Sequence, residues 1–341
     1  MPGRLHPDEG RDESAHYPVP ESIELSPLPW YGSLANPLAV GRALLGSLRA
    51  FWRILDDVDA VLLFGPHPSC FAFAALAALR GRRVVLGVRQ DLPAYTRNRH
   101  PDRRSIQLMA DVLELGYRLL SRLCRTVVVG PDLARKYRRA RRLLPINVSL
   151  IRDSDVAAGP SRADYDGELQ ALSVGRLEAE KNPLLLADAL AALGPESRWH
   201  LTVCGEGPLA GELEQRLEQL GLDGRARLAG YVPIDGGLLD LYRESHAMLH
   251  VSWTEGLPQI LFEAFAAGVP VVATAVGGVA EATGDAALLI PPGDPGAAAE
   301  ALERVAADAA LRERMVRAGL ERARAVTLEA ESERLARFIA A

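Results

Sequence analysis

The sequence predicts an α/β protein made of two successive doubly wound domains. Short apolar runs alternate with stretches of helical spacing along almost the whole chain, and one polar stretch interrupts this alternation before it restarts. Repeated strand and helix units of this kind imply parallel sheets that are covered by helices. A length of 341 residues with 48% hydrophobic residues is enough to bury two cores.

The first domain is expected over residues 21–152, after a polar segment at 1–20 that we expect to be poorly ordered. The apolar run at 60–79 is interrupted by Gly-Pro-His-Pro-Ser, so it indicates a strand, a loop and a helix rather than a membrane span. The elements expected in this domain are strands at 22–29, 58–64, 82–88, 125–130 and 147–151, and helices at 38–55, 69–79, 105–123 and 132–144.

The second domain is expected over residues 169–325, after a linker at 153–168 that is rich in turn formers and lacks apolar periodicity. A last helix at 326–341 is expected to pack back on the first domain. Ligands of doubly wound sheets bind at the carboxyl ends of the strands, so we expect the site in the cleft between the domains. The expected strands lie at 169–177, 199–205, 226–232, 247–252, 271–276 and 286–290, with helices between them.

Composition excludes several classes of protein. A net charge of −5 argues against general nucleic-acid binding, which needs a basic face. Cys70, Cys124 and Cys204 are far apart in the sequence, which fits reduced thiols in the cytoplasm better than a disulfide framework or a zinc site. The first residues are charged and lack the apolar core of a secretory signal. We therefore expect a cytoplasmic protein.

One candidate site for a diphosphate follows the strand at 169–177. Gly175 and Arg176 stand at the strand end, and Lys181 comes five residues after the arginine, just before a helix that begins with proline. Two cations near a helix N-terminus suit an anion, because the free amides and the helix dipole already favour one. The alternative is a pair of solvated surface charges. Only Lys136 and Lys181 are lysines in this arginine-rich chain, and a compact ammonium is suited to phosphate oxygens.

A second strand-to-helix turn reads Cys-Gly-Glu-Gly-Pro at 204–208. Gly205 and Gly207 permit the backbone to approach a ligand closely. The turn lacks the third glycine and the downstream acid of a dinucleotide fingerprint, so we do not interpret it as an NAD site. An ordinary tight turn is the alternative.

Two glutamates, Glu255 and Glu263, lie in the apolar stretch 254–274. The expected helix at 257–267 is apolar almost all round, as in a domain interior. Helical geometry separates the two carboxylates by roughly 12 Å. That distance is about the span from the sugar to the ribose of a nucleotide sugar, and the amides of Gly256 and Leu257 would lie between. The alternative is a helix cap and a partly exposed acid.

These motifs resemble the C-terminal domain of glycosyltransferase family 4, the retaining nucleotide-sugar transferases of the GT-B fold. The resemblance covers 169–341 and rests on G-R-x4-K, C-G-x-G-P, G-Y-V, and S-x-x-E-G-x-P-x4-E-A-x-A-x-G-x-P-V-V-A, followed by G-G. It implies two Rossmann-like doubly wound domains that face a cleft. It also implies transfer with retention, in which the acceptor hydroxyl attacks the face that the diphosphate leaves.

The resemblance also implies roles for individual residues. Arg176 and Lys181 would hold the donor diphosphate, Glu263 would take the ribose hydroxyls, and Val232 would lie near the base. Glu255 would orient the transferred sugar together with the amides from Gly256 onward. The sequence shows no Asp-x-Asp motif, so we predict a reaction without a metal ion or cofactor. The expected donor-binding residues are Gly175, Arg176, Lys181, Gly205, Val232, Glu255, Gly256, Leu257 and Glu263.

The N-terminal half departs from the family pattern. Nothing before 22–29 supplies the first strand and glycine-rich loop of the family, so the domain is expected to be shortened. His67 and Arg89 follow two expected strands and are candidates for contact with an acceptor or a phosphate. A solvated histidine and an ordinary surface pair between Arg89 and Asp91 are the alternatives. Because of this departure, a nucleotide-sugar-binding protein without turnover and a GT-B epimerase both compete with the transferase hypothesis.

The densest basic run, at 135–142, lies on the helix expected at 132–144. It would attract an anionic membrane surface or a phosphorylated lipid acceptor on the inner face of the membrane. A solvated helix in an arginine-rich chain is the alternative. The sequence identifies neither the donor sugar and base, nor the acceptor, nor the oligomeric state.

Overall fold

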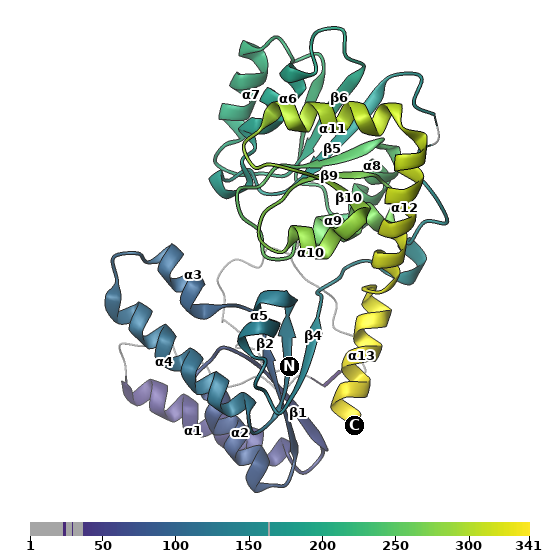
Figure 1. Cartoon of the computed structure of the whole chain (residues 1–341). Helices are drawn as coiled ribbons and strands as arrows, with labels where there is room; N and C mark the ends of the chain where they lie inside the picture. The colour runs from purple at the N-terminus through teal and green to yellow at the C-terminus, as the bar shows by residue number, and fades with distance from the viewer. Residues whose placement is uncertain (1–22, 25–28, 30–36, 163) are drawn as a thin grey trace. The chain divides into compact units, whose positions relative to one another are not determined.

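The computed structural model describes residues 23–24, 29, 37–162 and 164–341 (Figure 1). The polar segment at 1–20 and most of the strand expected at 22–29 lie outside the described residues. The described chain forms two compact units. One contains the described residues up to Val128 together with Tyr137–Leu144, and the other contains Val129–Lys136 and the described residues of Pro145–Ile339.

The first unit has a four-stranded sheet in the order β1-β2-β3-β4. The pairs β1–β2 and β2–β3 are parallel, as the alternation of strands and helices predicts. The elements are α1 (Pro37–Ile54), β1 (Ala60–Gly65), α2 (Ser69–Leu79), β2 (Arg83–Val88), α3 (Leu92–Arg99), α4 (Arg104–Ser121), β3 (Arg125–Val129) and β4 (Arg142–Ile146).

The prediction for 132–151 is wrong. Helix α5 spans only Gly130–Lys136, the chain then turns, and the strand lies at Arg142–Ile146 instead of 147–151. Tyr137 is buried to 1% exposure, which anchors the turn. A helix that continued through this segment would also place arginines three or four residues apart on its surface, and their like charges would repel one another. Pro145 is tolerated in β4 because this strand is at the end of the sheet.

Helix α3 is absent from the prediction although the sequence signals it. Asp91 caps the helix, since its Oδ1 accepts a 3.1 Å hydrogen bond from the amide of Ala94, and Pro93 lies in the first turn. The Asp-Leu-Pro signal was present, but the following Thr-Arg-Asn-Arg has no apolar periodicity.

The second unit has six strands in the order β10-β9-β8-β5-β6-β7, and every pair with a described register is parallel. This is a doubly wound sheet, and its strand order reverses between β8 and β5. Its strands are β5 (Leu169–Val174), β6 (Trp199–Cys204), β7 (Ala226–Gly230), β8 (Ala247–His250), β9 (Val271–Thr274) and β10 (Ala287–Ile290).

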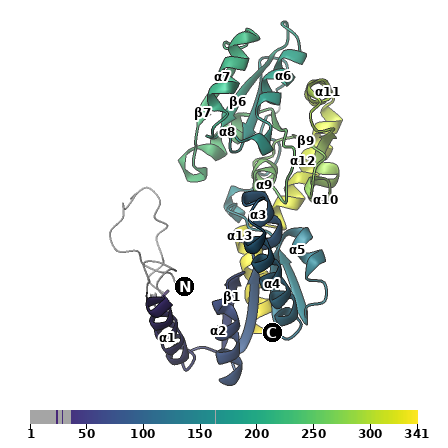
Figure 2. The same cartoon turned by 90° about the vertical axis from the view of Figure 1, so that its left-hand side faces the viewer.

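Helices cover both faces of this sheet (Figure 2). The sequence correctly predicts the helices that follow β5, β6, β7 and β8 and the long helices at the C-terminal end, whereas the short helix after β9 is absent from the prediction. The packing of α13 on the first unit stays a prediction. The helices are α6 (Leu184–Ala192), α7 (Ala210–Gln219), α8 (Leu238–Glu244), α9 (Gln259–Ala266), α10 (Val279–Thr283), α11 (Pro295–Ala307), α12 (Ala309–Arg324) and α13 (Leu328–Ala340).

Helix α9 is short and buried, as the sequence predicts. It begins at Gln259, two residues later than expected, because Pro258 is its N-cap in an extended conformation rather than a member of the first turn. Gly268 ends the segment with a φ of +73°, in the left-handed region that favours glycine. The side chains of Leu261, Ala264 and Phe265 are at most 1% exposed, so α9 is fixed by core packing.

None of the helices in the described part of the chain is both long enough and apolar enough to span a membrane.

Candidate active site

The loops after β5 and β8 adjoin at the point where the strand order of the second unit reverses. Gly175 and Arg176 follow β5 directly, and Glu255 lies five residues beyond the end of β8. Ligands of doubly wound sheets bind outside the carboxyl ends of the strands at this reversal. The candidate residues of two separate sequence motifs therefore meet where the fold favours a ligand.

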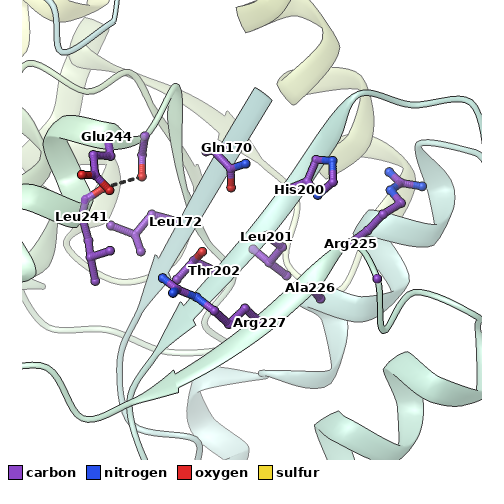
Figure 3. A pocket seen from close by; sticks show the side chains of 12 residues that line it. Gln170, Leu172, His200, Leu201, Thr202, Arg225, Ala226, Arg227, Leu241 and Glu244 are labelled. Atoms are coloured by element: carbon purple, nitrogen blue, oxygen red, sulfur yellow. Dashed lines mark hydrogen bonds between the residues drawn. The ribbon is translucent and has the colours of Figure 1, made fainter. Parts of the chain in front are cut away.

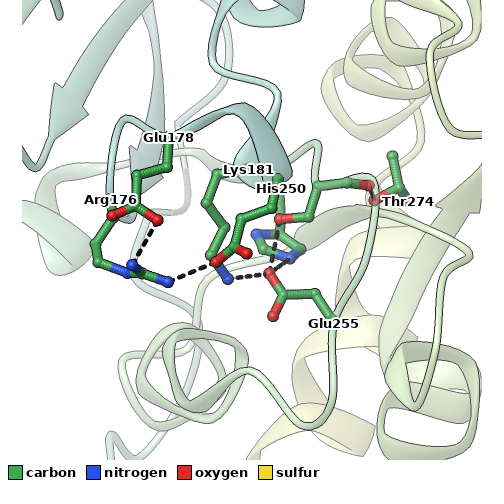
Figure 4. Close-up of polar contacts among 8 residues, drawn as sticks. Arg176, Glu178, Lys181, His250, Glu255 and Thr274 are labelled. Carbon is green, nitrogen blue, oxygen red and sulfur yellow. Dashed lines mark hydrogen bonds and ion pairs between the residues drawn. The ribbon is translucent and has the colours of Figure 1, made fainter. Parts of the chain in front are cut away.

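Three donor side chains converge on one oxygen of Glu255 (Figure 4). Lys181 Nζ and Ser252 Oγ each lie 2.6 Å from Glu255 Oε1, and His250 Nε2 lies 3.1 Å from the same atom. The Glu255 side chain is 7% exposed. The contacts formed by the described residues all use Oε1, which leaves Oε2 to accept hydrogen bonds from a ligand.

The carboxylate of Glu255 is held in its ionised form. Burial alone would raise its pKa, but the contacts with His250, Lys181 and Ser252 outweigh burial and lower the pKa to about 2. Its Oε1 is therefore a fixed negative charge above acidic pH, and Glu255 is an acceptor of hydrogen bonds rather than a proton donor.

This depressed pKa predicts a specific acid sensitivity. The folded pKa lies below the ordinary value of 4.5, so ionised Glu255 stabilises the fold above that value and the contribution is lost as the pH falls toward 2. The full shift corresponds to at most about 3 kcal/mol. We expect urea denaturation of the wild-type chain to show that the free energy of unfolding falls as the pH is lowered from about 5 to about 2.5, the range that proton linkage indicates for this shift.

The Glu255→Gln variant should lack this component, because glutamine does not titrate. Glu212→Gln, on the exposed side of α7, is the matched control and should keep it. An identical loss of stability with acid in the wild type and in Glu255→Gln would contradict the assignment.

The sequence assigned no role to His250, and Ser252 appears only as the first residue of the motif that contains Glu255. His250 is the last residue of β8 and is 4% exposed, and its Nε2 approaches Glu255 without the alignment of a full hydrogen bond. Ser252 is 1% exposed, and its carbonyl accepts a 2.8 Å hydrogen bond from Thr274 Oγ1. Their signal was a polar residue at the carboxyl end of a buried strand.

Arg176 does not contact Lys181 or Glu255 among the described hydrogen bonds and ion pairs. Its guanidinium binds Glu178 at 2.5 Å and also binds Glu180, and its side chain is 61% exposed. Each of the two predicted diphosphate cations therefore has a carboxylate counter-ion. Arg176 is exposed enough to turn toward an anion that offers more favourable charge-assisted hydrogen bonds.

The glycines of the second turn are explained by loop packing. A Cβ on Gly205 would lie 1.8 Å from the carbonyl oxygen of Gly175, and a Cβ on Gly207 would lie 2.5 Å from that of Leu177. The two loops are also joined by a 2.9 Å hydrogen bond from the amide of Gly175 to the carbonyl of Cys204. These glycines bring the two loops together, and the contact of Gly205 with a donor stays a prediction.

Gly277 and Gly278 fix the loop that carries Glu255. Gly277 has a φ of +51°, and a Cβ on it would lie 1.8 Å from the carbonyl oxygen of Glu255. A Cβ on Gly278 would lie 2.3 Å from the carbonyl oxygen of Gly256. The loop after β9 thus packs backbone against backbone on the Glu255 loop, so its position is set by the fold.

Replacing Gly277 with alanine is therefore expected to destabilise the chain. The substitution forces a left-handed alanine and a clash with backbone that cannot move away, for which we expect a cost of about 1–3 kcal/mol. Urea denaturation measures it. Gly224→Ala is the control, because no atom lies within 4 Å of its Cβ and its φ is not positive. Equal stability of Gly277→Ala and Gly224→Ala would contradict this packing.

Glu263 lies on α9 and is 7% exposed. Its Oε2 accepts a 3.1 Å hydrogen bond from the hydroxyl of Tyr242, a residue of α8 that sequence reasoning missed. Burial raises the pKa of Glu263, and the hydrogen bond from Tyr242 only partly opposes the rise. Glu263 is thus a buried acceptor that is held in place by its neighbour, and its contact with ribose stays a prediction.

The other donor candidates lie around these loops. Leu257 and Val232 are partly buried, and both pack against the same apolar core as Tyr242. Gly256 is exposed at its loop. Their contacts with a sugar or base stay predictions.

Known proteins resemble this chain in sequence and in fold. Residues 160–322 match the family model "Glycosyl transferases group 1". The sucrose-phosphate synthase of Thermosynechococcus elongatus superposes with a TM-score of 0.61 over 90% of this chain and 79% of its own, at 19% identity. HepE of Anabaena in complex with UDP and glucose superposes with a TM-score of 0.63 over 93% of this chain and 86% of its own, at 18% identity.

The chain has the GT-B fold. This confirms the fold that the motifs imply.

Curated relatives match only part of the chain. Mannosylfructose-phosphate synthase of Agrobacterium fabrum is 34% identical over 127 residues, which are 35% of this chain and 28% of the relative. D-inositol 3-phosphate glycosyltransferase of Corynebacterium glutamicum is 34% identical over 171 residues, which are 48% of this chain and 41% of the relative. The matched part of the chain thus spans less than half the length of these relatives.

Within this GT-B chain, His67 and Arg89 follow the neighbouring strands β1 and β2. His67 is exposed, and its Nδ1 lies 2.6 Å from Ser69 Oγ. Arg89 is exposed, and its guanidinium lies 5.8 Å from the centre of the Phe64 ring. Asp91, which the alternative interpretation pairs with Arg89, caps α3. Both candidates stand at carboxyl ends of strands, and their contact with an acceptor or a phosphate stays a prediction.

Among the described residues, no three His, Cys, Asp or Glu side chains are grouped to hold a metal ion. A reaction without a metal ion stays a prediction. Cys70, Cys124 and Cys204 are free and buried.

A separate cavity of about 270 Å³ lies over one face of β5, β6 and β7 beside α8 (Figure 3). Gln170, His200 and Ala226 line it, and they stand at or next to the first residues of these strands. The cavity is therefore near the amino ends of the strands, away from the loops that carry Arg176 and Glu255.

Proposed function

We propose that this chain is a retaining glycosyltransferase that moves a sugar from a nucleotide-diphosphate donor to a hydroxyl acceptor without a metal ion. The Glu255 cluster at the reversal of the strand order carries the proposal. It places a fixed carboxylate, with one free oxygen, beside a lysine inside the segment that matches the glycosyl transferase family. A sugar rich in hydroxyl groups and a diphosphate are the ligand groups that this pair suits.

Each residue has a distinct part in the proposed reaction. The bond between the anomeric carbon and the diphosphate oxygen breaks, and its electron pair stays on the diphosphate. Lys181 stabilises the charge that develops there, and Arg176 turns from its glutamate partners to do the same. Glu255 Oε2 accepts hydrogen bonds from the sugar hydroxyls, so it orients the sugar and forms no covalent bond.

The acceptor completes the step. Its hydroxyl oxygen attacks the anomeric carbon from the face that the diphosphate leaves, which retains the configuration, and its proton passes to the departing phosphate oxygen. The three side chains around Glu255 Oε1 keep the carboxylate ionised throughout, because its pKa of about 2 lies far below neutral pH.

A thermal-shift panel of UDP-, GDP- and ADP-sugars tests the donor class with the full chain. A ligand at 100 times its Kd stabilises a protein by about 2.7 kcal/mol, which is a shift of several degrees. We expect one nucleotide series to raise the melting temperature, and the free sugar to have no effect. No shift with any nucleotide sugar would contradict the proposal.

The two competing functions make different predictions for the same donor. A binding protein without turnover would hold the donor unchanged, and an epimerase would invert a sugar carbon without releasing the nucleotide. The likeness of the whole chain to solved GT-B structures favours neither. The match of 160–322 to a glycosyl transferase family favours the transferase.

A further inference from the structure

Helix α4 turns its apolar residues outward. Leu108, Val112, Leu115 and Leu119 recur at helical spacing on one side of α4 and are 65%, 62%, 56% and 51% exposed. The opposite side is buried and carries polar groups, namely Glu114, Tyr117 and Ser121 besides Ala110. A surface helix normally buries its apolar stripe. We call these four residues, together with the exposed Met109 on α4 and Leu123 just beyond its end, the α4 stripe.

A groove lined by arginines adjoins the α4 stripe. This cavity of about 660 Å³ has five arginines and no acidic residue among the described residues that line it. Three of the arginines are the first residues of β2, β3 and β4, which lie side by side in the sheet, so the fold brings them together at one edge. The arginines of this arginine groove are Arg82, Arg83, Arg125, Arg141 and Arg142.

The guanidinium groups repel one another. Partial desolvation and the neighbouring charges of Arg142, Arg83 and Arg141 lower the pKa of Arg125 from its usual value. A concentration of like charge favours binding of an anion, because the anion relieves the repulsion. Arginine suits phosphate in particular, since its planar fork offers two parallel hydrogen bonds.

Leu123 joins the two features. It lines the arginine groove and is 71% exposed as the end of the α4 stripe. The combined surface therefore presents leucines next to arginines, which matches the boundary of an anionic bilayer, where acyl chains adjoin phosphate groups.

We propose that the α4 stripe and the arginine groove dock together on an anionic membrane surface, with the leucines at the acyl boundary and the arginines on lipid phosphates. A nucleic acid would use the arginines but would leave the leucines in water. Two copies packed on each other by this surface would bring two arginine grooves close without an acid between them, which is unfavourable. This surface also extends beyond the basic run at 135–142, of which only Arg141 and Arg142 line the groove.

The proposed docking does not depend on the proposed sugar transfer. The arginine groove lies at the amino ends of β2, β3 and β4, whereas His67 and Arg89 follow the carboxyl ends of β1 and β2. A docked first unit therefore keeps the carboxyl ends of its strands away from the lipid, and a binding assay tests docking without any measure of activity.

Vesicle flotation of the full chain tests the proposal. We expect the chain to float with phosphatidylcholine vesicles that contain phosphatidylglycerol, to stay unbound with phosphatidylcholine alone, and to be released as salt screens the charges. The double variant Arg141→Gln with Arg142→Gln should weaken partitioning about 25-fold, since each basic residue near an anionic surface contributes about 1 kcal/mol, or about fivefold. Leu119→Ser with Leu123→Ser should also lose binding.

The control removes the same charge elsewhere. Arg314 and Arg317 are exposed on α12 of the other unit, and Arg314→Gln with Arg317→Gln should float like the wild type. All the substituted side chains are exposed, so the variants should melt like the wild type. The proposal would be overturned if the control lost vesicle binding as much as the Arg141 and Arg142 variant, or if the wild type bound neutral and anionic vesicles equally. Self-association of the wild type that disappears in the leucine variant would also overturn it, in favour of a contact between copies.

Discussion

Replacing Glu255 with glutamine is expected to lower turnover by about 10²-fold or more while changing donor affinity little, which is the size of effect seen when one preorganised polar group is removed from a transition state. Glutamine keeps the shape of the side chain but loses the fixed charge that His250, Lys181 and Ser252 hold in place. The loss should therefore fall on kcat. Steady-state kinetics with the donor from the thermal-shift panel measures it.

Two comparisons make this result specific. Glu212→Gln, on exposed α7, should transfer sugar at the wild-type rate. Thermal melts at neutral pH should show that Glu255→Gln is folded at the assay temperature. Wild-type turnover in a folded Glu255→Gln variant would remove Glu255 from the reaction.

Replacing Lys181 with alanine is expected to weaken donor binding by about 10- to 100-fold, because a hydrogen bond to a charged group contributes about 1.5–3 kcal/mol. Lys181 is 23% exposed and lies in a short loop segment, and Ser252 still donates to Glu255 in its absence, so the fold should tolerate the change. Isothermal calorimetry with the nucleotide sugar gives the affinity directly.

The chain offers a matched control for this experiment. Lys136, at the end of α5, is its only other lysine, and Lys136→Ala should bind the donor like the wild type. Equal affinity in Lys181→Ala and Lys136→Ala would remove Lys181 from the diphosphate site.

Most of the fold could be predicted because buried strands and helices leave a periodic apolar pattern. The continuous apolar runs correctly predicted the strands of both sheets except β4, and the helix at 105–123 was correctly predicted as α4. The side that α4 buries could not be predicted. Pattern reasoning expects the apolar stripe to lie inside, whereas α4 buries Glu114 and Tyr117 and exposes its leucines.

The basic run shows a different limit. A stretch of arginines gives no periodic signal, so the helix was extended past Lys136 and the strand at Arg142–Ile146 was placed too late. The burial of one side chain, Tyr137, decides where the chain turns. Tertiary packing of this kind overrides local propensity.

The candidate site was predictable where chemistry is unusual for its surroundings. Glu255 in an apolar stretch and Lys181 in an arginine-rich chain were both singled out, and the structure brings them within 2.6 Å. The roles of His250 and Ser252 as partners of Glu255 were missed, because a polar residue at the end of a buried strand does not by itself show which side chain it contacts. Only the pairing of β5 with β8 brings them beside Lys181.

Phosphorus NMR of the full chain with its nucleotide sugar and an acceptor extract measures directly whether this chain transfers sugar. We expect the donor signals to give way to those of the free nucleoside diphosphate, and this release to be strongly slowed in Glu255→Gln. A donor that stays intact while bound, or one whose sugar is epimerised with no nucleotide released, would contradict the proposed sugar transfer.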